Sequence, residues 1–146
     1  MCGIFVSSSE IFSSSEKINI AKQSLANRGP DDCNYERFKN GLTLLHTRLA
    51  IQDETEAGKQ PMFSNLSNNV IIYNGEIYNS KYLKSYLKKK YSFTPISNCD
   101  TEILLEGFSV EGKKFIEKID GIYAFVIYNK VNGDFYVARD SLGIKP

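Results

Sequence analysis

The chain begins Met1-Cys2-Gly3-Ile4, and the position of Cys2 in this stretch decides the fold that we expect. Methionine aminopeptidase removes Met1 when the second residue is small, which leaves Cys2 with both a thiol and a free α-amine. An α-amine titrates at about pH 8 and a thiol slightly above it, so the two can exchange a proton without a histidine. The alternative is a structural cysteine that opens a buried strand, because free cysteine is usually a buried apolar residue.

The composition is typical of one globular domain. A chain of 146 residues suffices for a single core, and we expect one domain over residues 1–146. Hydrophobic residues make up 42% and charged residues 24%, which argues against disorder. The 18 lysines and arginines stand against 17 aspartates and glutamates, and without a basic excess we expect no nucleic acid partner.

The sequence also limits the location and the cofactors. No apolar stretch has the length of a membrane span, and no basic segment followed by a hydrophobic one opens the chain, so we expect no membrane partner and a cytoplasmic location. Three widely spaced cysteines, Cys2, Cys33 and Cys99, suit a reducing compartment. With no CxxC pair and His46 as the one histidine, we expect no metal site, and we do not expect His46 to be catalytic.

Apolar periodicity predicts five strands and three helices. We expect the strands at residues 3–6, 42–51, 70–73, 123–129 and 135–139. The helices should begin at the serines 13–15, at Asn79 or Ser80, and at Asp100 or Thr101, which can cap them. Asn132-Gly133 is a typical hairpin turn between the last two strands. Strands at the start, middle and end with helices between them predict an α+β layered domain.

Four polar residues, three in or directly after two of these strands and one at a helix start, are candidates for binding. Arg48 lies in an apolar strand, where it is either a carboxylate ligand, because guanidinium donates two parallel hydrogen bonds, or a strand-edge residue that reaches solvent. Asn74-Gly75 is either a hairpin turn or an oxyanion hole, in which Gly75 lets the chain turn tightly. Glu76 and Asp100 are candidate anions for an ammonium group, although Asp100 can also cap a helix. Together these groups suit glutamine, which carries a carboxylate, an ammonium group and an amide.

The candidate residues belong to an ordered set of motifs that spans the chain and resembles the glutaminase half of asparagine synthetase B. The motifs are Met1-Cys-Gly-Ile4, Arg28-Gly-Pro-Asp31, His46-Thr-Arg-Leu-Ala-Ile-Gln-Asp53, Gln60-Pro-Met62, Asn74-Gly-Glu-Ile-Tyr-Asn79, Asp100-Thr-Glu102, Asp120-Gly-Ile-Tyr-Ala-Phe125, Ala138-Arg-Asp140 and Gly143-Ile-Lys-Pro146. Each motif is weak alone, and their order makes the resemblance specific. Cys99 and Ser141 depart from the residues that the family usually has at those positions.

The resemblance implies an N-terminal nucleophile hydrolase fold, a four-layer αββα sandwich with two antiparallel sheets. It also implies a role for each site residue. Cys2 would be the nucleophile and its α-amine the proton carrier, and Asn74 and Gly75 would form the oxyanion hole. The glutamine carboxylate would be held by Arg48 with main-chain help from Ile51 and Gln52, and the ammonium group by Glu76 and Asp100.

The implied activity is hydrolysis of L-glutamine to glutamate and ammonia through a γ-glutamyl thioester. We expect no cofactor in this domain, since ATP and Mg would serve the family's C-terminal synthetase domain, which lies outside this sequence and would be the partner that consumes the ammonia. A homodimer is possible. Three alternatives stay open: an amidotransferase domain that serves another acceptor such as a sugar acid, a hydrolase of another amide, and a non-catalytic glutamine-binding domain.

Overall fold

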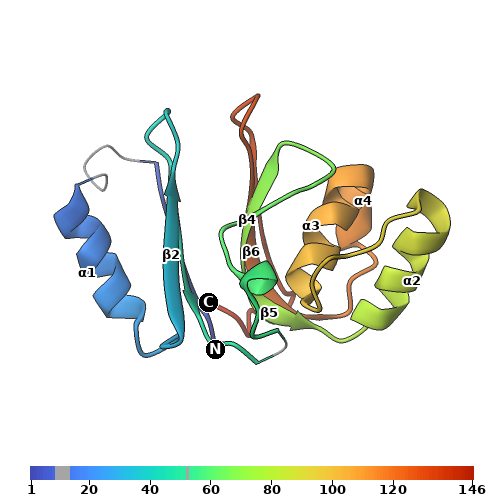
Figure 1. Cartoon of the computed structure of the whole chain (residues 1–146), viewed down its shortest axis with the longest axis horizontal. Coiled ribbons are helices and arrows are strands. Elements are labelled where there is room, and N and C mark those ends of the chain that lie inside the picture. Colours follow the sequence, from blue (N-terminus) through green and yellow to red (C-terminus); the bar gives the residue numbers. More distant parts are fainter. Residues whose placement is uncertain (9–13, 52) are drawn as a thin grey trace.

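The computed structural model describes residues 1–8, 14–51 and 53–146. It contains two antiparallel sheets, and Figure 1 shows them stacked face to face between two helical layers. The first sheet has the order β1-β3-β2 and consists of β1 (Gly3–Ser7), β3 (Thr43–Arg48) and β2 (Asp32–Arg37). The second has the order β4-β5-β6-β7 and consists of β4 (Met62–Phe63), β5 (Asn69–Ile77), β6 (Gly121–Asn129) and β7 (Phe135–Arg139).

The helices cover the two outer faces. On one side α1 (Ser15–Leu25) lies on the first sheet, and on the other α2 (Ser80–Tyr91), α3 (Asp100–Glu111) and the short α4 (Lys113–Ile116) cover the second (Figure 1). A 3-10 turn, η2 (Glu56–Gly58), lies in the connection from β3 to β4. The four-layer α+β architecture expected from the resemblance is therefore confirmed.

Alternation along β5 divides the core into two parts. Val70 and Ile72 pack in the space between the two sheets, while Ile71 and Tyr73 pack against the helices on the other face. Both faces of β5 are thus buried, which explains why the strand reads as a continuous apolar run. The residues between the sheets are Leu42, Leu44, Val70, Ile72, Val126 and Tyr128.

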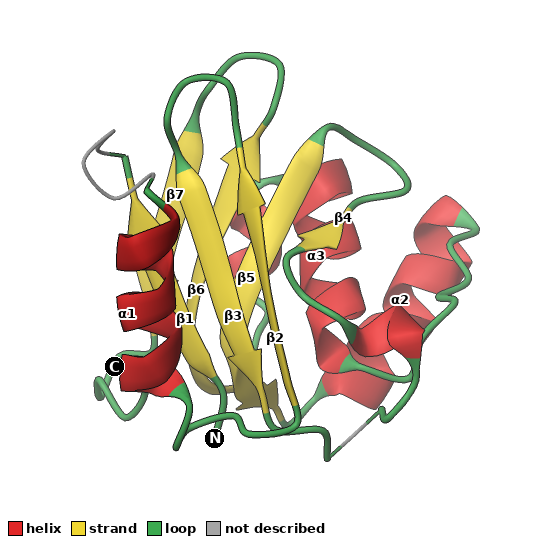
Figure 2. Cartoon of the chain, turned by 60° about the vertical axis from the view of Figure 1, so that its left-hand side comes forward, coloured by secondary structure: helices red, strands yellow, loops and turns green. Residues whose placement is uncertain are grey.

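The same alternation places polar residues at one end of the space between the sheets. On β3, His46 and Arg48 continue the face that carries Leu44, because side chains two residues apart share a face. Asn74 continues the face of Ile72 on β5, and Cys2 precedes Ile4, which packs against the same core. Three strands therefore direct polar side chains to one place. Both chain ends lie at this end of the sheets (Figure 2).

The structure corrects several local predictions. The strand expected at 42–51 ends at Arg48, and the strand expected at 70–73 runs to Ile77. Strand β2 was missed, because its polar sequence at a sheet edge lacks a clear apolar alternation. The predicted hairpin between β6 and β7 is confirmed, with Gly133 at a φ of 78°.

The helix starts were predicted with mixed success. Ser14, one of the three serines at 13–15, caps α1 by accepting a hydrogen bond from the Lys17 N–H, although residue 13 lies outside the described part of the chain. Asn79 occupies the N-cap position of α2. The prediction for α3 was wrong by one residue, because Cys99 precedes the helix and Asp100 is its first residue. The Asp100 carboxylate is engaged elsewhere, as the site geometry shows.

Candidate functional site

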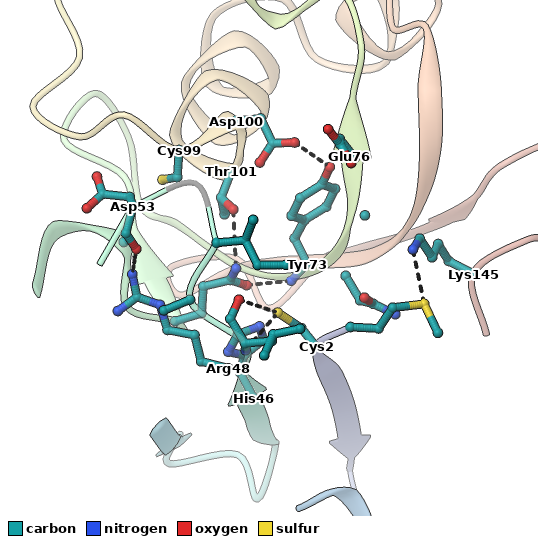
Figure 3. A pocket seen from close by; sticks show the side chains of 18 residues that line it. Cys2, His46, Arg48, Asp53, Tyr73, Glu76, Cys99, Asp100, Thr101 and Lys145 are labelled. Carbon is teal, nitrogen blue, oxygen red and sulfur yellow. Dashed lines mark hydrogen bonds between the residues drawn. The ribbon is translucent and has the colours of Figure 1, made fainter. Parts of the chain in front are cut away.

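A half-open pocket of about 200 Å³ lies where the polar ends of β1, β3 and β5 meet the start of α3. It is lined by Cys2, by His46 and Arg48 from β3, by residues 73–76 of β5, and by residues 99–101 at the start of α3 (Figure 3). Lys145 closes the side next to Met1, and residues 49–51, Asp53, Gly58 and Gln60 close the opposite side. The pocket therefore gathers every described residue for which the sequence predicted a role in the site.

The Cys2 thiol is held against the loop that follows β3. Its Sγ accepts a hydrogen bond from the Leu49 N–H at 3.4 Å, and its carbonyl accepts one from Arg28 Nε at 3.2 Å. The next residue is fixed as well, since the Gly3 N–H donates to Thr47 Oγ1 at 3.1 Å. A side chain at Gly3 would lie within 2.6 Å of the same oxygen, so only glycine fits this approach. The start of β1 thus has one position relative to β3.

The segment Arg28-Gly29-Pro30-Asp31 joins the ends of β1 and β3. In addition to the Arg28 bond, the Asp31 N–H donates to the Arg48 carbonyl at 3.0 Å, and Asp31 Oδ2 accepts from the Ala50 N–H at 2.7 Å. Gly29 lies so close to the backbone of Thr47 that any Cβ would overlap it. The sequence indicated this segment only as one of the ordered motifs. Its positioning role could not be derived from local patterns, because it depends on contacts with a distant strand.

Arg48 is a buried residue of the pocket wall, with only 7% of its surface exposed. Its guanidinium donates to the Thr55 carbonyl at 3.1 Å and to the Asp53 carbonyl. The Asp53 carboxylate accepts from Thr55 and from the Asn98 N–H, and these hydrogen bonds lower its pKa. The alternative of a solvent-reaching arginine is therefore wrong. Arg48 is held in place by carbonyl oxygens, and among the described residues no carboxylate forms an ion pair with it.

The edge of β5 presents one unsatisfied donor to the pocket. The Tyr73 N–H donates to Gln60 Oε1 at 2.6 Å, and the Ile77 N–H donates to Asp100 Oδ2 at 2.8 Å. Alternate residues of a strand direct their N–H groups to the same side, so the Gly75 N–H lies on this edge between them. No hydrogen-bond acceptor for it is found among the described residues. An N–H group held in this way can stabilise a negatively charged oxygen.

Glycine is required at position 75 for a different structural reason from the one we predicted. The sequence suggested a tight turn at Asn74-Gly75, but both residues lie inside the continuous strand β5. A Cβ at Gly75 would lie 2.5 Å from the Ile122 carbonyl oxygen and 2.8 Å from the Tyr123 Cα. Glycine is thus required for the close approach of β6. The neighbouring Asn74 is 3% exposed and lines the pocket.

Asp100 is a buried carboxylate whose oxygens face β5. Its Oδ2 accepts from the Tyr73 hydroxyl and from the Ile77 N–H, each at 2.8 Å. Burial raises the pKa of Asp100, and the two hydrogen bonds oppose that rise. Glu76 lies at the exposed rim of the pocket. Sequence reasoning missed Gln60 and Tyr73, which orient the β5 edge and Asp100. The motif Gln60-Pro-Met62 was visible but indicated no role.

The remaining predictions have separate outcomes. Ile51 lines the pocket with 76% of its surface exposed, while Gln52 lies outside the described residues. Cys99 also lines the pocket, but burial raises the pKa of its thiol, which disfavours the reactive thiolate.

Within the described part of the chain, no group of three or more His, Cys, Asp or Glu side chains is placed to hold a metal ion. Across residues 1–8, 14–51 and 53–146, no helix is both long and apolar enough to span a bilayer.

His46 is a buried neutral side chain. Only 1% of its surface is exposed, and burial lowers its pKa to about 4, against a hydrogen bond with the Tyr73 backbone that acts in the opposite direction. Its Nε2 has no hydrogen-bond partner among the described residues. A histidine that stays uncharged well below neutral pH acts in packing and hydrogen bonding rather than as a cation.

We predict that His46 titrates in the folded protein at a pH near 4. In the unfolded chain His46 binds this proton with a pKa of about 6.5, so the buried neutral form contributes its full stabilisation above that pH. As the pH falls from about 6.5 toward 4, the free energy of unfolding decreases by about 3 kcal/mol in total. His46 is the one histidine of the chain, so its Cε1–H resonance in an NMR titration reports the pKa directly. A midpoint near 6.5 would contradict the buried position.

The comparisons with known proteins agree with this geometry. The family model described as "Glutamine amidotransferase domain" matches residues 1–146. A putative glutamine-hydrolysing asparagine synthetase 2 of Methanocaldococcus jannaschii is 35% identical over 90% of this chain. A probable glutamine-hydrolysing asparagine synthetase of Acanthamoeba polyphaga mimivirus is 42% identical over 84%, and the glutamine-hydrolysing asparagine synthetase B of Escherichia coli is 34% identical over 84%.

The matched region is only a part of each relative. The chain spans 28%, 22% and 21% of the lengths of these three proteins. The family model, in contrast, covers every residue of the chain. The resemblance drawn from the ordered motifs is therefore confirmed, and the chain belongs to the family of glutamine amidotransferase domains, in the form found in asparagine synthetase-like proteins.

Proposed function

We propose that this domain hydrolyses L-glutamine to glutamate and ammonia with Cys2 as the nucleophile. The observation that carries the proposal is the convergence of the Cys2 thiol, the Asn74 amide and the Gly75 N–H on one pocket. The thiol supplies a nucleophile, and the other two supply the donors that a developing oxyanion requires. A glutamine-binding domain without catalysis would need donors for the amide oxygen but no thiol beside them, so this grouping favours the enzyme.

The charged groups of the pocket suit the two ends of the glutamine backbone. Arg48 would bind the α-carboxylate, because among the described residues its guanidinium donates only to carbonyl oxygens. The resemblance implies main-chain help from Ile51 and Gln52 in this role. Asp100 and Glu76 would bind the α-ammonium group from the opposite wall. This distribution favours an α-amino acid over a simple amide, and it supports glutamine as the substrate over another amide.

The reaction follows from these positions. Removal of Met1 would expose the Cys2 α-amine, which accepts the thiol proton as Sγ attacks the amide carbon of the substrate side chain. The negative charge on the amide oxygen is then stabilised by Asn74 and the Gly75 N–H. As the C–N bond breaks, the α-ammonium group returns the proton to the leaving ammonia, and a γ-glutamyl thioester remains on Cys2. Water attacks the thioester with the amine as base and releases glutamate.

The ammonia would be used by a larger protein. The relatives are named glutamine-hydrolysing asparagine synthetases, and this chain matches between 21% and 28% of their length. We propose that a synthetase domain outside this sequence, with ATP and Mg, consumes the ammonia in the cytoplasm, with aspartate as the acceptor. An acceptor such as a sugar acid is the second candidate, since the residues of this pocket contact only the ammonia donor.

We predict that Asn74→Ala binds glutamine but hydrolyses it slowly. Loss of one oxyanion donor costs about 3 kcal/mol in the barrier, which is a decrease in kcat of roughly 100-fold. Stopped assays of glutamate release measure kcat, and a crystal soaked with glutamine should contain the intact substrate. Asn34→Ala, a change on β2 outside the pocket, is the matched control and should retain the wild-type rate. Wild-type turnover by Asn74→Ala would refute the oxyanion role.

We further predict that Tyr73→Phe weakens glutamine binding. The variant removes a hydrogen bond that keeps the Asp100 carboxylate ionised, so the pKa of Asp100 should rise further. An ionised carboxylate is needed to hold the ammonium group. When the pH is lowered, the variant should therefore lose activity at a higher pH than the wild type does.

The measurement is the pH profile of kcat/KM for glutamine, with an increase in KM of about tenfold at neutral pH. Tyr128→Phe is the control, because Tyr128 has the same 3% exposure but contacts Asn40 away from the pocket. Identical pH profiles for Tyr73→Phe and the wild type would show that Asp100 does not need the Tyr73 hydroxyl to bind the ammonium group, and would contradict this prediction.

A further inference from the structure

The turn that follows β7 has a built geometry without a role in the reaction described so far. Asp140 accepts the Ile144 N–H at 2.9 Å, the Lys145 N–H at 3.1 Å and the Tyr123 N–H of β6 at 3.2 Å. The Arg139 guanidinium donates to the carbonyls of Gly143 and Lys145. These bonds fix the backbone of Lys145 relative to the second sheet.

The Lys145 side chain is directed by this turn into the pocket. The residue is 8% exposed, and its Nζ lies 3.2 Å from Met1 Sδ (Figure 3). Among the described residues no carboxylate pairs with its ammonium group, and a thioether is a weak acceptor. A buried ammonium group is costly unless it is paired, so its position beside Met1 is unusual for a purely structural lysine.

Processing of the N-terminus changes what Lys145 faces. Met1 is joined directly to Cys2, and both residues line the same pocket as Lys145. Removal of Met1 takes away the thioether and creates the α-amine on the residue next to the one that Lys145 Nζ contacts. We propose that Lys145 is a positioning residue that acts through Cys2: its positive charge favours the neutral form of the Cys2 α-amine, the form that can accept the thiol proton. The inference rests on the proposed function, in which this amine is the proton carrier.

The physical basis is repulsion between like charges. A cation close to an amine in a poorly solvated pocket disfavours protonation of that amine, so the neutral base is present at lower pH. A proton carrier is most effective when it changes its charge near the working pH. Lys145 would therefore increase the fraction of enzyme molecules whose amine is ready to accept a proton at neutral pH.

The other charged groups around Cys2 have hydrogen-bond partners or are exposed to solvent. Two further described cations donate to carbonyl oxygens: Arg28 Nε to that of Cys2, and Arg48 to those of Asp53 and Thr55. Asp53 and Asp100 accept backbone N–H bonds, and Glu76 is exposed, so its charge is screened by solvent.

Three titratable side chains of the pocket are uncharged at neutral pH. Burial lowers the pKa of His46 to about 4, and burial raises the pKa of both Tyr73 and Cys99. Among the described residues, Lys145 is thus a cation that contacts Met1, the residue next to Cys2. Its ammonium group has no carbonyl or carboxylate partner among those residues.

The test measures the α-amine directly and without glutamine. Protein whose first residue is Cys2, as verified by peptide mass, is treated with methyl methanethiosulfonate to block thiols and then with trace acetic anhydride at a series of pH values. Acetylation of the N-terminal peptide, measured by mass spectrometry, gives the pH at which the amine loses its proton. We expect this midpoint to lie about one pH unit higher in Lys145→Met than in the wild type, and unchanged in Lys145→Arg.

Lys114→Met is the matched control, because it removes the same charge from an exposed position on α4. Its midpoint should equal that of the wild type. Lys145→Gln provides a second uncharged side chain if Lys145→Met does not fold. Equal midpoints in the wild type and a folded uncharged variant would overturn the inference, even if that variant raised the KM for glutamine. Since no substrate is present, the result is independent of whether the domain hydrolyses glutamine.

Discussion

The antiparallel pairing of β1 with β3 is the constraint on which the rest of the site depends. It aligns Gly3 with Thr47, and the Thr47 hydroxyl both receives the Gly3 N–H and donates to the Leu25 carbonyl at the end of α1. Because this pairing has one register, Cys2 and Arg48 emerge together at the end of the first sheet. The second sheet then needs only to be stacked in one orientation to bring Asn74 opposite them.

The packing between the sheets explains how two separate hydrogen-bonded sheets form one site. Apolar residues of both sheets fill the space up to Leu44 and Ile72, and the next residues on the same faces are His46 and Asn74. The apolar core thus ends where the polar pocket begins. Buried polar groups there are costly unless paired, which explains why Arg48, Asp53 and Asp100 are each held by backbone groups.

Much of this arrangement was predictable from the sequence, and the reasons for the exceptions are physical. Apolar alternation located β1, β5, β6 and β7, and the ordered motifs identified Cys2, Arg48, Asn74, Gly75 and Asp100 as the residues that meet. Strand β2 and the roles of Gln60 and Tyr73 were missed, because they depend on long-range pairing that local patterns do not encode. The tight turn expected of Gly75 was wrong, because the close approach of β6, rather than a special backbone angle, requires glycine there.

The central claim is that Cys2 is the nucleophile of a glutamine-binding pocket, and covalent labelling tests it most directly. Protein with Cys2 at its N-terminus would be treated with 6-diazo-5-oxo-norleucine, an electrophilic analogue of glutamine, and the adduct located by intact mass and peptide mapping. The account predicts one adduct, on Cys2, that excess glutamine prevents from forming, while Cys33 and Cys99 stay unmodified. A free Cys2 that stays unlabelled, or labelling that glutamine does not reduce, would contradict it.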